Sequence, residues 1–136
     1  MRRAGSAACR WAVIVCEIMG WLIASPANAH HSAAMFDQQK ALTLQGTVKE
    51  FQWTNPHCWI ELLVAAPGGT RQWSIEMIAP SQLYRLGWRP GSIRIGEQLT
   101  VVVNPVRDGT QGGQFVSAIS ADGRHLGYGI APGAKP

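Results

Sequence analysis

Three of the four histidines in this sequence stand where they could hold a metal ion. His30 and His31 directly follow Ala27-Asn28-Ala29, and His57 follows Asn55-Pro56. If the chain is cut after Ala29, His30 becomes an N-terminus whose α-amino group and imidazole can chelate one metal together. Imidazole suits copper, zinc and nickel, and Cu(II) leads the affinity order of the divalent ions. The sequence therefore predicts a metal site of His30, His31 and His57, with copper as the first candidate.

Cleavage two residues earlier would also leave an N-terminus that can bind a metal ion. A cut after Ala27 would leave Asn28-Ala29-His30, which places a histidine third, another geometry that binds Cu(II) or Ni(II). A free α-amino group has an ordinary pKa of about 7.7–8, so the metal would compete with protons and bind better above neutrality. Meeting His57 requires residues 30–40 to fold back nearly extended, at about 3.3–3.6 Å per residue. A histidine pair in an exported tail that binds nothing stays an open alternative.

The first 29 residues have the pattern of a secretory signal peptide. Arg2, Arg3 and Arg10 precede the apolar stretch 11–24, and Ala27-Asn28-Ala29 is a small-x-small cleavage site. The apolar stretch is short for a membrane span, which needs about 20 residues. We therefore expect a periplasmic or secreted protein with no stable membrane span after cleavage. A retained anchor is the alternative, and it would abolish the metal site.

Removing the signal peptide changes the charge and the cysteine count. Three of the twelve basic residues and one of the eight acids leave with it, so nine and seven remain and the net charge is +2. No basic cluster of the kind that binds nucleic acid remains, and we expect no nucleic-acid partner. Cys58 is then the one cysteine left, so the mature domain is expected to have no internal disulfide.

The elements predicted for the mature chain are strands with one short helix. Pro80 suits the first helical position and Gly87 the residue after the last, which predicts a helix over 80–86. Alternation of apolar and polar residues, with turn residues between, predicts the strands. They cover residues 42–53, 58–64, 71–78, 99–103 and 115–120, with a short sixth strand near 124–126.

The order β-β-β-α-β-β is that of a small, partly open barrel, the OB-fold, and a small β-sandwich is the alternative. The predicted domain plan has four parts. They are a signal peptide (1–29), an N-terminal arm (30–40), an OB-like barrel (41–127) and a flexible tail (128–136).

Strand periodicity also predicts which side chains face the core. The apolar phase of the first strand slips between Val48 and Phe51, so we expect a β-bulge near Lys49-Glu50. In the second strand Cys58 has the phase of the apolar residues and should point inward. His57 and Trp59 should then share the opposite face.

In an OB-fold the loops after the first and fourth strands flank the ligand face. Both loops begin with Asn-Pro here, so we expect a ligand or partner face at this end of the barrel. Its predicted residues are Trp53, Asn55, Trp59, Arg107 and Asp108. The plainer interpretation is that the tryptophans pack and that the Arg-Asp pair lies in a solvated turn. A metal-independent protein- or glycan-binding module is accordingly the alternative function.

No motif for catalysis is present. The sequence has no G-x-S-x-G, no H-E-x-x-H and no P-loop, and its strand glutamates have no evident partner carboxylate. No catalytic residue is predicted, and a binding module is favoured over an enzyme.

Several motifs together resemble a family of small exported proteins of Gram-negative bacteria, known only as a domain of unknown function. The resemblance covers nearly all of the mature chain, and it implies export and a small β-barrel but no activity. The motifs are His30-His31-Ser32, Met35-Phe36-Asp37, Leu44-x-Gly46-Thr47-Val48, Phe51-x-Trp53-Thr54-Asn55-Pro56-His57-x-Trp59-Ile60, Trp73-x-Ile75-Glu76, Leu86-Gly87-Trp88 and Asn104-Pro105-x-x-Asp108-Gly109.

Overall fold

The structure is a computed structural model that describes residues 34–129. The predicted signal peptide, His30, His31 and most of the predicted tail lie outside these residues. No helix within the described part combines the length and hydropathy that crossing a membrane requires.

Within residues 34–129, six strands and one short helix follow the predicted order. The sixth strand is present, and most predicted boundaries shift by one to three residues. The elements are β1 (Leu42–Gln52), β2 (Trp59–Ala66), β3 (Gly69–Glu76), α3 (Pro80–Arg85), β4 (Gln98–Pro105), β5 (Gly112–Ser120) and β6 (His125–Gly127).

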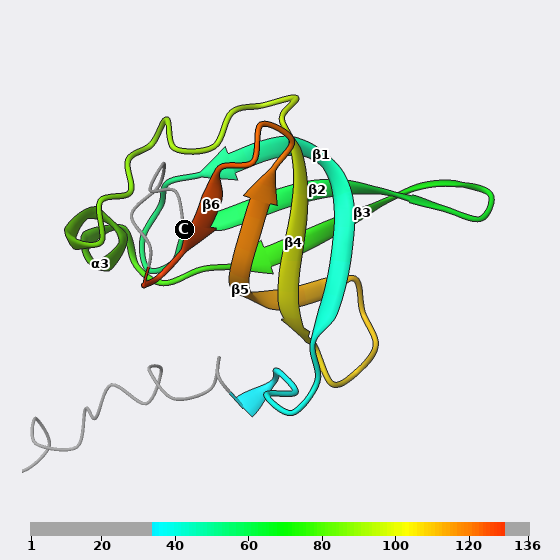
Figure 1. The fold of residues 1–136 in the computed structure, drawn as a ribbon. Coiled ribbons are helices and arrows are strands. Elements are labelled where there is room, and N and C mark those ends of the chain that lie inside the picture. The colour runs from blue at the N-terminus through cyan, green and yellow to red at the C-terminus, as the bar shows by residue number, and fades with distance from the viewer. Residues whose placement is uncertain (1–33, 130–136) are drawn as a thin grey trace, which may run out of the picture. The chain divides into compact units, whose positions relative to one another are not determined.

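The strands form one sheet that closes on itself. Its order is β3-β2-β1-β4-β5-β6, and a parallel pairing between β3 and β5 closes the first five strands into a barrel (Figure 1). The other pairings are antiparallel, and β6 pairs with β5 at residues 117–119, beyond the part of β5 that pairs with β3. This is the strand order of the OB-fold, so the predicted OB-like barrel is confirmed.

β1 takes part in both halves of the barrel because it bends. Val48 pairs with Leu62 but Glu50 pairs with Glu61, so Lys49 is the extra residue of the predicted bulge. Gly46 pairs with strands on both sides of β1. A Cβ atom at Gly46 would lie 2.4 Å from a backbone oxygen of β2, which explains why glycine stands there.

The interior of the barrel is apolar and includes two large aromatic rings, Trp88 and Phe115. These rings lie edge to face with centroids 5.8 Å apart. Trp88, just beyond α3, also donates from its indole nitrogen to the carbonyl of Gly127 in β6. Leu83 is the buried residue of α3. The helix and the residue that follows it therefore belong to the core.

Candidate functional site

The β1–β2 loop (residues 53–58) is held at its base by backbone hydrogen bonds to the segment after β3. Cys58 donates to the carbonyl of Ile78 at 3.3 Å and accepts from the amide of Met77 at 2.9 Å. The Cys58 side chain is fully buried, as predicted, and burial raises the pKa of its thiol. The thiol is therefore inert, and His57 projects on the opposite side.

His57 is paired with a carboxylate that the sequence-based prediction did not include. Its Nδ1 contacts Oε1 of Glu76 at the end of β3. The Glu76 side chain is 8% exposed and that of His57 33% exposed. A carboxylate only accepts, so Nδ1 carries the hydrogen and Nε2 is the ring nitrogen left for a ligand. This carboxylate–imidazole arrangement is the one that typically orients a metal-binding histidine.

Glu76 lies in a row of side chains that crosses the outer surface of the barrel. In register, Gln52 of β1 faces Trp59 of β2, Trp59 faces Glu76 of β3, and Glu76 faces Gln114 of β5. We call this set, with Glu50 and Glu61 in the row beside it, the outer β1–β3 face. Through this row Glu76, the partner of His57, is the neighbour of Gln114 in β5.

The second row of the outer β1–β3 face is acidic and hydrogen-bonded. Glu61 faces Glu50 on β1, and its Oε2 accepts from Gln72 at 2.7 Å and from Ser74 at 2.8 Å. Lys49 in turn donates to the Gln72 side chain at 2.7 Å. With Glu76, three carboxylates therefore lie on the outer β1–β3 face.

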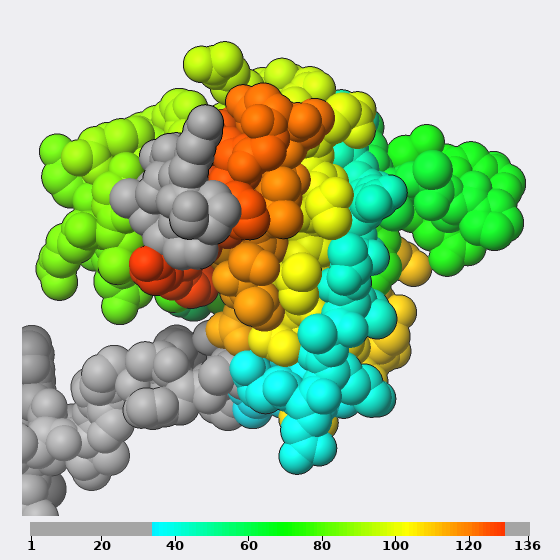
Figure 2. All heavy atoms as spheres, viewed as in Figure 1, coloured from blue at the N-terminus to red at the C-terminus, as the bar shows by residue number. Residues whose placement is uncertain are grey.

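The β4–β5 loop (residues 106–111) is covered by the protein's own N-terminal arm. Phe36 forms a β-bridge with Val106, and its ring is 2% exposed. On either side of the bridge, Asp37 donates to the carbonyl of Pro105 at 2.8 Å and Arg107 donates to that of Met35 at 2.9 Å. In Figure 2 the first described residues, in cyan, lie against the amber atoms of this loop. Residues 34–37 are thus docked on the barrel.

The charged residues predicted at the β4–β5 loop are engaged within the protein. Arg107 donates from Nε to the carbonyl of Ala34 at 3.2 Å, and its Nη1 lies 3.8 Å from Asp37. Asp108 accepts from the amide of Thr110 at 2.9 Å and from its hydroxyl at 2.8 Å, and these bonds lower the pKa of Asp108. Arg107 therefore contacts the arm, and Asp108 closes the turn.

The arm also touches the row that contains Glu76. Gln38 donates to the side chain of Gln114 at 2.6 Å, and Gln114 is the neighbour of Glu76 across the β3–β5 pairing. Asn104 of the second Asn-Pro pair holds the end of the arm, donating to the carbonyl of Lys40 at 2.8 Å. The arm, the β4–β5 loop and the His57–Glu76 pair are therefore parts of one connected surface.

The two tryptophans predicted for the ligand face have different surroundings. Trp53 packs its ring edge-on against Phe51, with centroids 5.9 Å apart, and contacts the hydrophobic core. Trp59 is half-buried in the row of the outer β1–β3 face, next to Glu76. Asn55 is exposed at the tip of the β1–β2 loop. Of the predicted set, Trp59 is the one that lies beside the His57–Glu76 pair.

Residues 34–129 contain no group of three or more histidine, cysteine, aspartate or glutamate side chains arranged to hold a metal ion. His57 and Glu76 supply a pair, and any further ligand would have to come from elsewhere. The predicted partners, His30 and His31, lie outside the described residues. The three-histidine site therefore stays a prediction.

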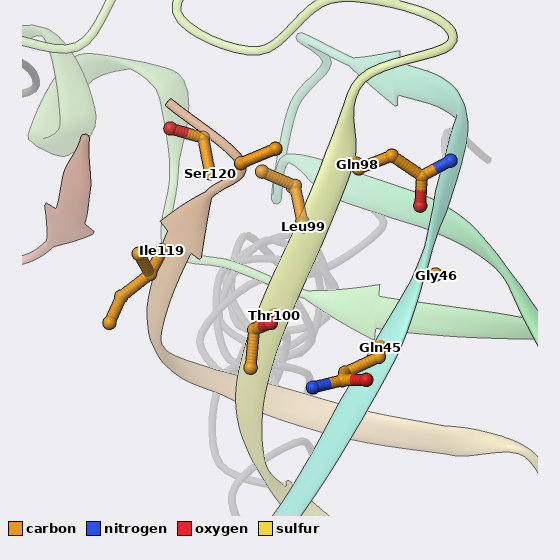
Figure 3. Close-up of a pocket in the computed structure, with 8 residues that line it drawn as sticks. Gln45, Gly46, Gln98, Leu99, Thr100, Ile119 and Ser120 are labelled. Carbon is orange, nitrogen blue, oxygen red and sulfur yellow. The ribbon is translucent and has the colours of Figure 1, made fainter. Parts of the chain in front are cut away.

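A shallow cavity of about 270 Å³ lies on the outside of β1, β4 and β5 (Figure 3). It contains no ionisable side chain and offers no group for acid–base or metal chemistry. Its lining residues are Gln45, Gly46, Gln98, Leu99, Thr100, Ile119, Ser120 and Ala121.

Glu76 could have been found from the sequence by counting strand register. The Pro67-Gly68 turn makes Ala66 and Gly69 face one another, and counting back from that pair places Trp59 opposite Glu76. The parity that put His57 and Trp59 on one face also put Glu76 outside.

Comparison with known protein families finds a match. A model described as "Family of unknown function (DUF6152)" matches residues 21–115. The chain belongs to this family. The match confirms the resemblance to a domain of unknown function, and it assigns no activity to this chain. No curated protein matches it.

Among solved structures, the chain is similar to the mitochondrial single-stranded DNA binding protein Rim1 of S. cerevisiae. The two share 15% sequence identity with a TM-score of 0.45, over 60% of this chain and 94% of that one.

Proposed function

We propose that this protein is an exported OB-like module that binds a transition metal, copper first, through His57 and the N-terminal histidines His30 and His31. The observation that carries the proposal is the His57–Glu76 pair. It holds the imidazole by Nδ1 and leaves Nε2 for a ligand, on a loop that is partly open to solvent.

The mature N-terminus would supply the remaining ligands. After cleavage behind Ala29, the α-amino group and imidazole of His30 offer a chelate, and His31 or a backbone amide adds a further donor. A nitrogen-rich set of this kind favours Cu(II). Binding would weaken at acidic pH, because the amine and imidazoles must lose their protons to bind.

Export to the periplasm is part of the same proposal. It is supported by the basic, apolar and small-x-small pattern of residues 1–29. Processing matters for the chemistry, since a retained leader would leave His30 without a free α-amino group.

The test is a Cu(II) titration of protein exported and processed in a bacterial periplasm, with its N-terminal residue determined. His57→Ala and the double variant His30→Ala/His31→Ala should each weaken binding at least about tenfold, since loss of only an outer-shell partner of a metal ligand typically costs about 10–100-fold. His125→Ala, a half-buried histidine in β6, is the matched control and should bind as the wild type does. Equal and weak binding by all four proteins would overturn the proposal.

A metal-independent protein- or glycan-binding module is the second candidate. Trp59 favours it, because a half-buried indole flanked by Gln52 and Glu76 offers a stacking surface beside hydrogen-bonding groups. In that case Trp59→Ala abolishes capture of the partner or glycan, and a chelator has no effect on it.

A further inference from the structure

We infer that a neutral groove on the outside of the barrel binds an uncharged oligosaccharide. The groove crosses β5, β4, β1 and the β2–β3 hairpin. None of its lining residues belongs to the His57–Glu76 pair or to the row of side chains that contains Glu76. The inference is therefore independent of the proposed metal site.

Two shallow hollows make up the neutral groove. One is the cavity of about 270 Å³ outside β1, β4 and β5 (Figure 3). The other, of about 380 Å³, lies over β1, β4 and the β2–β3 hairpin. Gln45, Gly46 and Gln98 line both hollows, so the two meet where β1 pairs with β4. Each volume is near the lower end of the usual range for ligand sites, about 300–1,000 Å³.

Strand register places the side chains of the groove on one surface. Gln45 of β1 faces Thr100 of β4. One row along, Thr47 of β1 faces Gln98 of β4 on one side and Leu63 of β2 on the other. Side chains two apart in a strand point to the same side, so both rows share the outer surface. From β5 to β3 the groove crosses four strand spacings, at most about 19 Å, which suits a chain of several sugar units.

The groove offers hydrogen bonds without charge. None of the residues that line it, all of them within 34–129, is charged or aromatic. Its polar groups are side-chain amides and hydroxyls, each of which can both donate and accept. In Figure 3 Gln45 extends from β1 toward β4 and Gln98 from β4 toward β1, and Gln98 donates to Thr47 at 2.6 Å. Sugar hydroxyls also donate and accept, whereas a charged ligand would lose hydration here and gain no ion pair.

The apolar side chains of the groove suit the carbon faces of sugar rings. Ile119 on β5 is 43% exposed and Leu63 on β2 is half-buried, so an aliphatic side chain lies toward each end. The C–H groups of a sugar can cover these side chains while its hydroxyls bond the amides. Because no aromatic ring lines the groove, the ligand gains no stacking, and we expect weak binding.

A peptide fits the groove less well than a sugar chain does. Extended peptides usually bind a sheet by adding a strand at an exposed edge, through backbone hydrogen bonds. The groove instead crosses the faces of strands whose edges are paired, since β1 lies between β2 and β4, and β4 between β1 and β5. The backbone groups of these strands bond within the sheet, so the groove presents mainly side chains to a ligand.

The experiment is a titration of the isotope-labelled full chain with cellohexaose, maltohexaose and chitohexaose, followed by NMR. At least one of these neutral sugars should cause saturable chemical-shift changes that are largest at residues 45–47 of β1 and 98–100 of β4. An oligogalacturonate of the same length carries carboxylates and should cause smaller changes, because the groove has no cation to pair with them.

Substitutions in the groove test which groups bind the sugar. Gln45→Ala and Gln98→Ala should each weaken binding about two- to tenfold, as loss of a hydrogen bond does. Gln111→Ala is the matched control, because it removes an exposed amide on the β4–β5 loop, and it should bind as the wild type does. Gln98 also bonds Thr47, so Thr100→Val, which removes only a hydroxyl, is a second test and should weaken binding by a similar factor.

Four results would overturn the inference. They are no saturable change with any of the three sugars, equal binding by the groove variants and the wild type, changes centred on Trp59, and equal changes with an uncharged glycine–glutamine peptide. Changes centred on Trp59 would support the second candidate function instead. Copper binding is measured separately, so failure of the groove leaves the proposed metal site intact, and failure of the metal site leaves the groove intact.

Discussion

The β1–β2 loop and the β4–β5 loop begin with the same dipeptide, Asn-Pro, but their surroundings differ. The β1–β2 loop presents His57 to solvent and fixes it through Glu76. The β4–β5 loop is covered by residues 34–37, and its Arg107 and Asp108 are bonded within the protein. The shared dipeptide therefore accounts for two turns, and the contacts around each turn decide what it can do.

The difference has a physical origin in one side chain. Phe36 has an apolar side chain that is buried, and its backbone forms a β-bridge with Val106 of the β4–β5 loop. Arg107 and Asn104 then supply donors to the carbonyls of Ala34 and Lys40. The β1–β2 loop instead has exposed polar residues at its tip, and its buried residue, Cys58, faces the barrel. An OB-like barrel can thus use one of its two loops at this end to hold the segment that precedes its first strand.

The largest expected effect is on the covered loop. Phe36→Ala removes a buried aromatic ring and should lower the free energy of unfolding by about 3–5 kcal/mol, measured by urea denaturation. Met35→Ala is the matched control, because Met35 is 46% exposed, and it should change stability by less than about 0.5 kcal/mol. If the two variants were equally stable, the arm would not be part of the fold, and the contrast between the loops would fail.

The second-largest expected effect is in β5, the strand that follows the β4–β5 loop. A Cβ atom at Gly113 would lie 2.8 Å from Val103, so Gly113→Ala should cost about 1–3 kcal/mol in unfolding free energy. Gly91→Ala, where an added Cβ meets nothing within 4 Å, is the control. Thermal unfolding of both would show whether this end of the barrel is as closely packed as the contacts indicate. Equal melting temperatures would argue that it is not.

A third effect concerns the open loop. Glu76→Gln keeps the shape of the side chain but removes the charge that holds Nδ1 of His57, and Cu(II) affinity should fall about tenfold. Glu50→Gln changes an exposed glutamate of the same face and should leave affinity within about twofold, since charges at an exposed site interact weakly. An equal loss in both variants would mean that the charge of the face, and not the His57–Glu76 contact, determines binding.

The smallest effect is a pH dependence of the docked arm. The pKa of Asp37 lies below its ordinary value, first because Lys40 donates a hydrogen bond to it. A carboxyl group with a lowered pKa adds stability above its unfolded pKa, and that stability is lost as pH falls through the folded value. Wild type should therefore lose more stability than Asp37→Asn on acidification below about pH 4, and the difference between them should shrink at lower pH. Parallel acid-denaturation curves would show that Asp37 does not stabilise the docked arm.

Strand periodicity and turn chemistry by themselves determined much of this protein. Between Val48 and Phe51 the apolar residues switch from one face of the strand to the other, and this switch located the bulge. One extra residue in a pattern of period two has this effect. The same period sent Cys58 inward and His57 outward, and the order of elements predicted the OB-like barrel. These are local properties of the chain, so they can be read without knowing its partners in space.

Only the tertiary structure decided which residues meet around the site. Arg107 and Ala34 are separated by 73 positions in sequence, and Gln38 and Gln114 by 76. Such contacts depend on the register of several strands and on which ring is buried where, and no local pattern carries that information. The pairing of Glu76 with His57 lies between these cases, since one turn sets the register of Trp59 with Glu76, two residues along the chain from His57. The arm on the β4–β5 loop is a contact of the same kind as those of Arg107 and Gln38, because Phe36 and Val106 lie far apart in the sequence and meet only in the folded chain.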